Sequence, residues 1–271
     1  MQFDQLYENY VVRPSEAYRS AIESPAEPLS GAMNALIAQL QTFQGSNAGL
    51  AFWQIIAYKT LSHIASGGDV HIFGQRLCTM RDFILKIHPQ YLLPYFRWRA
   101  AGYTPILQNN FPIDLKRIIL RQSIPLKAKD GQYYWFSMFA STLQIDAAGR
   151  IVSNLHTFYL EGKWSPKTMR PFEASVQLDN WASTELDQNL VRQLTPDLID
   201  EFTDAELDLI SLYASGKSTE EVIKAKNWSR YTLHEYNANL LKKSKALFVY
   251  DFRNAREFAE YCLEKGYIHL R

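Results

Sequence analysis

The sequence predicts an α+β protein of two domains, with an antiparallel sheet and flanking helices in the N-terminal part and an all-helical C-terminal domain. The 271 residues are enough for two domains that each bury a core. Between residues 48 and 162, runs rich in aromatic and β-branched residues alternate with turn signals, which is typical of strands. From Phe202 to Ser244, apolar residues instead recur at helical spacing.

The composition excludes several classes of protein. A formal net charge of +1 argues against a general binder of polyanions. No apolar run approaches the length of a transmembrane helix, and the first residues lack the pattern of a signal peptide. Two cysteines, Cys78 and Cys262, make a disulfide framework implausible. We therefore expect a soluble, cytoplasmic protein.

The chain divides into four expected segments. The first is a helical flank that caps the following domain or supplies a dimer contact, and the third is a linker, partly helical from Ala182 to Leu194. The expected bounds are 1–47 for the flank, 48–162 for the sheet domain, 163–196 for the linker and 197–271 for the helical domain.

The sheet domain is expected to hold five antiparallel strands, arranged as a hairpin, then short helices, then a three-stranded meander. The expected turns are Gly67-Gly68 in the hairpin, and Asp130-Gly131 and Asp146–Gly149 in the meander. The expected strands are Phe52–Ile64, Asp69–Phe73, Arg121–Ala128, Tyr133–Leu143 and Ile151–Leu160. The expected short helices are Arg81–Ile87, Tyr91–Arg99 and Asp114–Leu120.

The strand Tyr133–Leu143 is apolar on both faces. Alternation places Tyr134, Phe136 and Met138 on one face and Trp135 on the other. We expect the short helices to cover one face, and the N-terminal segment or a second subunit to cover the other. Two interpretations of the first face stay open. Its three side chains belong to a plain core, or they line a pocket for an unidentified small molecule.

This order of elements resembles a PAS domain, a sensory and dimerisation module. The resemblance spans residues 48–162 and rests on Ile87-His88-Pro89, Lys129-Asp130-Gly131 before Tyr134-Trp135, and Gly149-Arg150-Ile151. Light-sensing PAS domains carry an Asn-Cys-Arg motif, whereas Cys78 lies in Arg-Leu-Cys-Thr, so no flavin or other cofactor is expected. Haem bound through His71 or His88 is the alternative to a histidine packed at a turn.

Capping signals bound the C-terminal helices. Serine or threonine followed three residues later by glutamate begins two of them, and glycine ends one because it adopts the left-handed conformation at low cost. The residues that carry these signals are Thr203, Glu206, Gly216, Ser218, Glu221, Asn227 and Ser229. Two helices joined by a tight turn, the second of them long and amphipathic, predict a helix-turn-helix.

In this order the signals resemble the four-helix LuxR-type, or GerE-like, DNA-binding domain of bacterial transcription regulators. The matching residues are Phe202, Thr203, Glu206, Gly216, Ser218, Glu221, Val222, Ser229, Thr232, Leu233, Asn239, Leu240 and Lys243, with Arg253, Ala255, Phe258 and Gly266-Tyr267-Ile268 in the closing helix. Lys226, His234 and Tyr236 depart from the family pattern. The resemblance covers the last quarter of the chain and implies a regulator that binds double-stranded DNA as a homodimer.

The helix Ser229–Lys243 is the expected recognition helix. Helical spacing puts Arg230, His234, Asn237 and Leu241 on one stripe, which is expected to be exposed. The expected contacts with bases are Thr232, His234 and Asn237, and the expected contacts with phosphate are Ser218, Arg230, Lys242 and Lys243.

Charge leaves two other functions open. Residues 195–271 hold 11 lysines and arginines against 13 aspartates and glutamates, whereas a DNA-binding domain is usually basic. One alternative is a protein-interaction scaffold without DNA affinity, and the other is a ligand-binding protein that signals to another protein. No enzyme and no metal site are expected, because the histidines lack zinc-binding spacing and no phosphate-binding loop is present.

Overall fold

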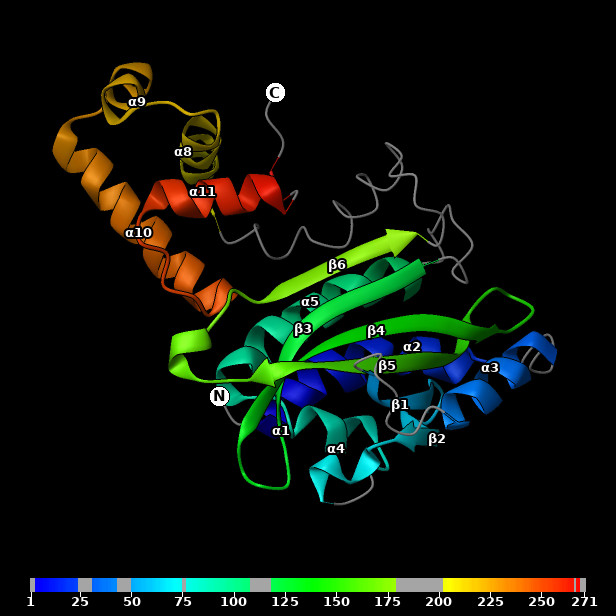
Figure 1. The fold of residues 1–271 in the computed structure, drawn as a ribbon. Coiled ribbons are helices and arrows are strands. Elements are labelled where there is room, and N and C mark those ends of the chain that lie inside the picture. Colours follow the sequence, from blue (N-terminus) through cyan, green and yellow to red (C-terminus); the bar gives the residue numbers. More distant parts are fainter. Residues whose placement is uncertain are drawn as a thin grey trace.

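The structure, a computed structural model, shows a six-stranded antiparallel sheet with helices on both faces, followed by a cluster of helices (Figure 1). It describes residues 3–23, 31–42, 50–74, 77–107, 118–178, 202–265 and 267–268. The predicted helix Ala182–Leu194 lies outside these residues. The strand order is β2-β1-β5-β4-β3-β6. The strands are β1 Leu50–Ala57, β2 Ser62–Gly68, β3 Ile118–Lys127, β4 Tyr133–Ile145, β5 Ile151–Lys163 and β6 Glu173–Leu178.

The three-stranded meander was predicted correctly. At the turn between β3 and β4, Gly131 has a φ of 80° and the Asp130 carboxylate accepts a hydrogen bond from the Gln132 amide at 2.9 Å. Gly149, with a φ of 77°, plays the same part between β4 and β5. Both glycines adopt the left-handed conformation that such turns require.

The predicted turn of the first hairpin was wrong. The chain turns at Tyr58–Leu61, Gly67 and Gly68 stay within β2, and Val70–Phe73 forms a 3-10 helix (η2) instead of a strand. Packing explains the two glycines, since a Cβ atom at Gly67 would lie 2.7 Å from the Trp53 ring. They permit close contact between β2 and β1.

A sixth strand extends the predicted five-stranded sheet. β6 lies within the segment expected to be a linker, and it pairs with β3 from Ile118 opposite Leu178 to Ser123 opposite Glu173. The prediction of helix up to Leu120 was also wrong, because Ile118–Leu120 belongs to β3. Pairing between distant segments decided both outcomes, and local composition did not reveal it.

Short helices cover the inward face of the sheet. Phe52 of β1 stacks on Phe158 of β5 with ring centroids 4.2 Å apart, and Phe83 packs on Phe158 at 5.3 Å. Phe136 completes this apolar centre. The covering elements are η2, α4 Met80–Ile84, η3 Pro89–Tyr91 and α5 Leu92–Leu107.

The N-terminal segment reaches both sides of the domain. On the outward face, α3 Gly31–Thr42 lies against β1, where the Trp53 indole donates to the Leu40 carbonyl at 3.1 Å. The N-terminal segment thus covers part of the second apolar face, as expected. The remaining helices of this segment pack against α5, and they are α1 Phe3–Tyr7, the π-helical η1 Glu8–Val12 and α2 Arg13–Ala21.

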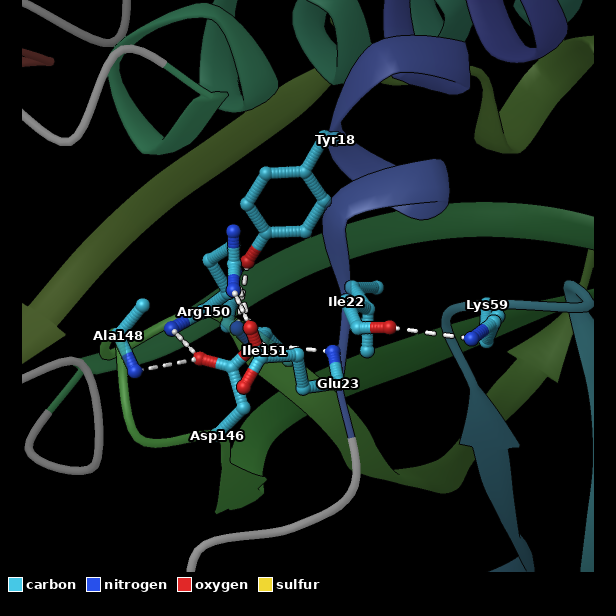
Figure 2. A network of polar contacts seen from close by, with 8 residues as sticks. All are labelled: Tyr18, Ile22, Glu23, Lys59, Asp146, Ala148, Arg150 and Ile151. Atoms are coloured by element: carbon cyan, nitrogen blue, oxygen red, sulfur yellow. Dashed lines mark hydrogen bonds and ion pairs between the residues drawn. The ribbon is translucent and has the colours of Figure 1, made fainter.

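A polar network ties the end of α2 to the turn between β4 and β5 (Figure 2). The fully buried Asp146 carboxylate accepts from the backbone amides of Glu23, at 3.1 Å, and Arg150, at 2.9 Å, and from the Arg150 side chain at 2.8 Å. Burial acts to raise the pKa of Asp146, but these hydrogen bonds outweigh it and hold the pKa below its usual value. The Tyr18 hydroxyl accepts from the Ile151 amide. The helical flank is therefore anchored to the sheet.

The described residues after 201 form four helices, and the first three begin where the capping signals predicted, whereas α10 continues to Phe248 beyond its expected end at Lys243. They are α8 Asp204–Ala214, α9 Thr219–Lys226, α10 Arg230–Phe248 and α11 Ala255–Glu264. Both predicted capping boxes form, at Thr203 with Glu206 and at Ser218 with Glu221. Gly216 has a φ of 82° directly after α8, as a glycine at a helix C-terminus should.

The segment before β6 connects the sheet to these helices. Phe172 is completely buried, and its backbone amide donates to the Phe248 carbonyl at the end of α10 at 2.8 Å. The Tyr261 hydroxyl of α11 donates to the Phe172 carbonyl at 3.1 Å. An ion pair of 3.2 Å between Lys265 and Glu173 adds to this junction.

Candidate nucleic-acid interface

The turn between α9 and α10 sets the direction of the predicted recognition helix. Asn227 takes the left-handed conformation, with a φ of 51°, and the Trp228 amide donates back to the Ile223 carbonyl at 3.1 Å. Ser229 then caps α10, because its hydroxyl accepts from the Thr232 amide at 3.0 Å. Figure 1 shows α9 and the first turns of α10 projecting away from the sheet.

Buried leucines fix the rotation of α10 about its axis. Leu233, Leu240 and Leu247 recur every seven residues and are at most 2% exposed. Positions on the opposite side of the helix therefore face outward. The exposed stripe consists of Tyr231, His234, Glu235, Ala238 and Lys242.

Of the residues expected on the recognition surface, three are exposed on α10 or at its start. Arg230, His234 and Lys242 are all exposed. Arg230 lies 3.5 Å from Glu220, but both side chains are more than two-thirds exposed, so this ion pair contributes little to stability. Thr232 is half-buried, and its hydroxyl lies 2.8 Å from that of Ser229.

The expected stripe through Asn237 and Leu241 was wrong. Asn237 is half-buried, and its side-chain oxygen accepts a hydrogen bond from the Tyr213 hydroxyl of α8 at 3.1 Å. Leu241 packs against the core. The exposed stripe is thus rotated from the expected one, and Asn237 joins two helices instead of facing outward.

Two of the residues expected to contact phosphate already have partners within the protein. The Ser218 hydroxyl caps α9 by accepting from the Glu221 amide at 3.3 Å. Lys243 donates to Glu206 at 2.7 Å, and the Glu206 side chain is only 5% exposed. Burial acts to raise the pKa of Glu206, but hydrogen bonds from Lys243 and Thr203 outweigh it and lower the pKa.

Two of the residues that depart from the LuxR-type pattern, Lys226 and Tyr236, lie against the ring of Trp228. Trp228 and Tyr236 stack with ring centroids 4.2 Å apart and ring planes only 4° from parallel. The Lys226 ammonium lies over the Trp228 ring and donates to Asp208 at 2.6 Å. Lys226 is therefore held by pairing with an acidic side chain and an aromatic ring.

Sequence reasoning missed two positions on the exposed stripe, Tyr231 and Ala238. Tyr231 is 71% exposed, which is unusual for so large an aromatic side chain. The seven-residue spacing of the buried leucines carries the signal that would have identified them. Because Leu233 and Leu240 face the core, the residues half a helical turn away from them face the solvent.

The residues expected around a ligand on β4 do not form one site. Phe136 and Met138 are buried among apolar side chains, at 0% and 3% exposure. Tyr134 instead reaches the tip of the hairpin, where its hydroxyl donates to Asp130 at 2.8 Å. A pocket on this face remains a proposal, and these three side chains do not outline it.

The two histidines considered for haem differ in their surroundings. The Nδ1 atom of His88 accepts from the Gln90 amide at 3.3 Å, and the ring lies 4.1 Å from Trp164 and 4.5 Å from Tyr133. Burial lowers the pKa of His88. His71 is exposed. His88 is therefore packed at a turn, against Trp164 and Tyr133.

The described ranges hold neither a cluster of metal ligands nor a membrane-spanning helix. Among those residues no three histidine, cysteine, aspartate or glutamate side chains gather as a metal site would require. Within the same ranges, no helix combines the length and apolar character needed to span a membrane.

Comparison with known proteins does not establish a family. No family model and no curated protein matches the chain. Among solved structures, the Vibrio cholerae VqmA dimer matches 86% of this chain and 88% of its own at 11% identity and a TM-score of 0.33. Phage VqmA in complex with DPO matches 88% and 91% at 15% identity and a TM-score of 0.30.

The N-terminal domain of a diguanylate cyclase with a PAS/PAC sensor from Marinobacter aquaeolei matches 41% of this chain and 94% of its own. Its identity is 11% and its TM-score is 0.31. TM-scores of this size are too low to establish a shared fold with any of these proteins.

Proposed function

We propose that the chain is a transcription regulator that binds double-stranded DNA through α10, under the control of its PAS-like N-terminal domain. The observation that carries the proposal is the form of α10. One side is fixed by buried leucines, and the other presents a continuous exposed stripe that begins at its capped N-terminus. The N-terminal residues of such a helix are those that reach base edges in the major groove.

The proposed contacts follow from exposure. His234 and Tyr231 lie in the first turns of α10 and face outward, where a neutral imidazole supplies one donor and one acceptor to base edges. Arg230 and Lys242 supply positive charge toward phosphate on either side of them. The Thr232 hydroxyl lies beside that of Ser229, the residue that caps α10. Lys243 holds α8 against α10 through Glu206 and is not among the proposed DNA contacts.

We further propose that the regulator acts as a homodimer. A helix-turn-helix reads one half-site, so a two-fold dimer places two recognition helices about one turn of DNA apart. The PAS-like domain is the proposed dimerisation and sensory element, because its half-buried Phe139 and Tyr159 lie on the outward face of the sheet. Light scattering that shows a monomer at micromolar concentration, with and without DNA, would contradict the dimer.

Titration of a fluorescent duplex with the purified chain at several salt concentrations tests the proposal. Binding is expected to weaken as salt rises, with a logarithmic slope of about one unit for each phosphate contact. A slope near zero, or no binding at low salt, would contradict DNA binding.

A second function is favoured by the charges of this region. Lys226, Lys243 and Lys245 are each paired with an acidic side chain, and acidic residues outnumber basic ones between 195 and 271. A scaffold for protein contacts would use the same exposed stripe without a phosphate requirement. Failure of the salt titration would favour this alternative.

A further inference from the structure

The inward face of the sheet carries a group of polar side chains beside its apolar centre. The register places Gln54 of β1 directly opposite His156 of β5, with Asn154 two residues along the same strand. On its other side, His156 pairs with Ala140 of β4. Gln122 of β3 pairs with Met138, the next inward-facing residue of β4. These four polar side chains are at most 4% exposed.

Several atoms of these side chains have no hydrogen-bonding partner among the residues that the structure describes. They are Gln54 Nε2, both side-chain atoms of Gln122, Asn154 Oδ1 and His156 Nδ1. The Asn154 amide group does donate to the Tyr58 hydroxyl at 3.3 Å. Unsatisfied buried polar atoms are costly, and a core of apolar side chains would avoid that cost. So many on one face indicate a molecule that supplies the missing partners.

The helical layer adds positive charge to this face. Arg99 of α5 is only 6% exposed, and its guanidinium lies near enough to act on both His156 and Tyr95. Burial, with a smaller contribution from the positive charge of Arg99, lowers the pKa of His156 to about 3, so the imidazole is neutral at physiological pH. A neutral imidazole provides one donor and one acceptor, while the electrostatic field around it favours negative charge.

We propose that Gln54, Arg99, Gln122, Asn154 and His156, the buried polar cluster, bind a small organic carboxylate. The carboxylate end accepts hydrogen bonds from Gln54 and benefits from the charge of Arg99. The acceptor atoms of Gln122 and Asn154 suit a donor group elsewhere on the same molecule. The proposal names a ligand class for the sensory domain, and its test needs no DNA, so it can fail independently of the DNA-binding proposal.

Thermal denaturation of the full chain with matched pairs of probes tests the ligand class. The pairs are benzoate with benzamide, picolinate with picolinamide, and lactate with lactamide. At least one carboxylate is expected to raise the melting temperature, and its neutral amide is expected to have no such effect. Equal effects of acid and amide would overturn the assignment of a carboxylate.

If no probe changes the melting temperature, mass spectrometry of the small molecules released by the denatured protein shows whether a carboxylate was already bound. If no probe stabilises the chain and no carboxylate is released, the buried polar cluster is a hydrated part of the core and the proposal fails.

A variant at Gln54 tests the residues. Gln54→Met keeps the length of the side chain and removes the unpartnered atom, so the unliganded protein is expected to melt at a higher temperature. Carboxylate binding by this variant is expected to weaken about tenfold or more. Gln132→Met, at the exposed tip of the hairpin, is the matched control and should change neither property. Unchanged carboxylate binding by Gln54→Met would contradict the proposed site.

Discussion

At the scale of single residues, the α10 surface is decided by which side chains already have partners. Asn237 accepts a hydrogen bond from Tyr213, and Lys243 pairs with Glu206. These contacts within the protein compete with the contacts to bases and to phosphate that were expected of the two side chains. His234 and Lys242 are exposed and face outward. Exposure, more than residue type, selects the proposed DNA contacts.

His234→Ala is expected to lower discrimination at one base pair by about 1–3 kcal/mol, because base edges lose a donor or acceptor. Asn237→Ala is the matched comparison. It is expected to leave discrimination unchanged but to lower the free energy of unfolding by about 1 kcal/mol, since Tyr213 loses its acceptor. Affinities for a panel of single-substituted duplexes, with urea denaturation of each variant, measure both effects. Loss of discrimination in Asn237→Ala, with unchanged discrimination in His234→Ala, would show that Asn237 contacts the base.

Lys242→Ala is expected to weaken binding to all duplexes alike, because contact with phosphate carries no sequence information. The salt dependence should flatten by about one unit. Lys127→Ala, an exposed lysine at the end of β3, serves as the control and should change neither affinity nor slope. Identical salt slopes for Lys242→Ala and the parent would remove Lys242 from the interface.

At the scale of elements, Glu206 links α8 to α10. Its carboxylate accepts from the Thr203 amide at 2.8 Å, which caps α8, and from Lys243 of α10 at 2.7 Å. Glu206 therefore caps the start of α8 and also holds the proposed recognition helix in place.

Glu206→Gln is expected to lower the free energy of unfolding by about 1–3 kcal/mol at neutral pH, because a buried charged acceptor is lost. The folded-state pKa of Glu206 is lowered, so its contribution is complete above the unfolded-state pKa of about 4.3. That contribution is lost as the pH falls through the folded value. Urea denaturation of parent and variant from pH 7 down to pH 3 should show the two converging.

Glu260→Gln, on the exposed side of α11, is the control for this experiment and should match the parent at every pH. A constant difference between Glu206→Gln and the parent across the acid range would contradict the role given to the Glu206 charge.

The elements also show how far local sequence determines the fold. The C-terminal helices were predictable because Thr203, Ser218 and Gly216 fix their ends through bonds within a few residues. The first hairpin was not predictable, since Gly67 serves contact with Trp53 rather than a turn. β6 was not predictable either, because its partner β3 is distant in sequence. The rotation of α10 followed from Leu233 and Leu240, but the role of Asn237 depended on Tyr213.

At the scale of the whole molecule, Phe172 joins the sheet to the proposed DNA-binding helices. The chain around it is held on the sheet side by the Tyr91 hydroxyl, which donates to the Arg170 carbonyl at 2.7 Å, and by the Trp135 indole, which donates to Thr168 at 3.1 Å. On the other side, Phe172 bonds to α10 and α11. The segment around Phe172 therefore contacts both the sheet domain and α10.

Phe172→Ala is expected to lower the free energy of unfolding by about 3–5 kcal/mol, the usual cost of removing a buried phenyl ring. Because the ring lies at the junction, we also expect one unfolding transition to separate into two. Leu85→Ala, at an exposed position directly after α4, is the control and should keep a single transition. Urea denaturation followed by tryptophan fluorescence and circular dichroism measures both. A single transition with unchanged midpoint would show that Phe172 does not couple the two parts.

The central claim, that α10 reads DNA, is tested most directly by selection of genomic fragments with the purified full chain, alongside His234→Ala. The account predicts that the parent enriches fragments sharing one motif, with two half-sites about one helical turn apart. His234→Ala is predicted to enrich a motif that is relaxed at one position in each half-site. Fragments no more enriched than in a protein-free control, or the same motif for both proteins, would contradict the claim.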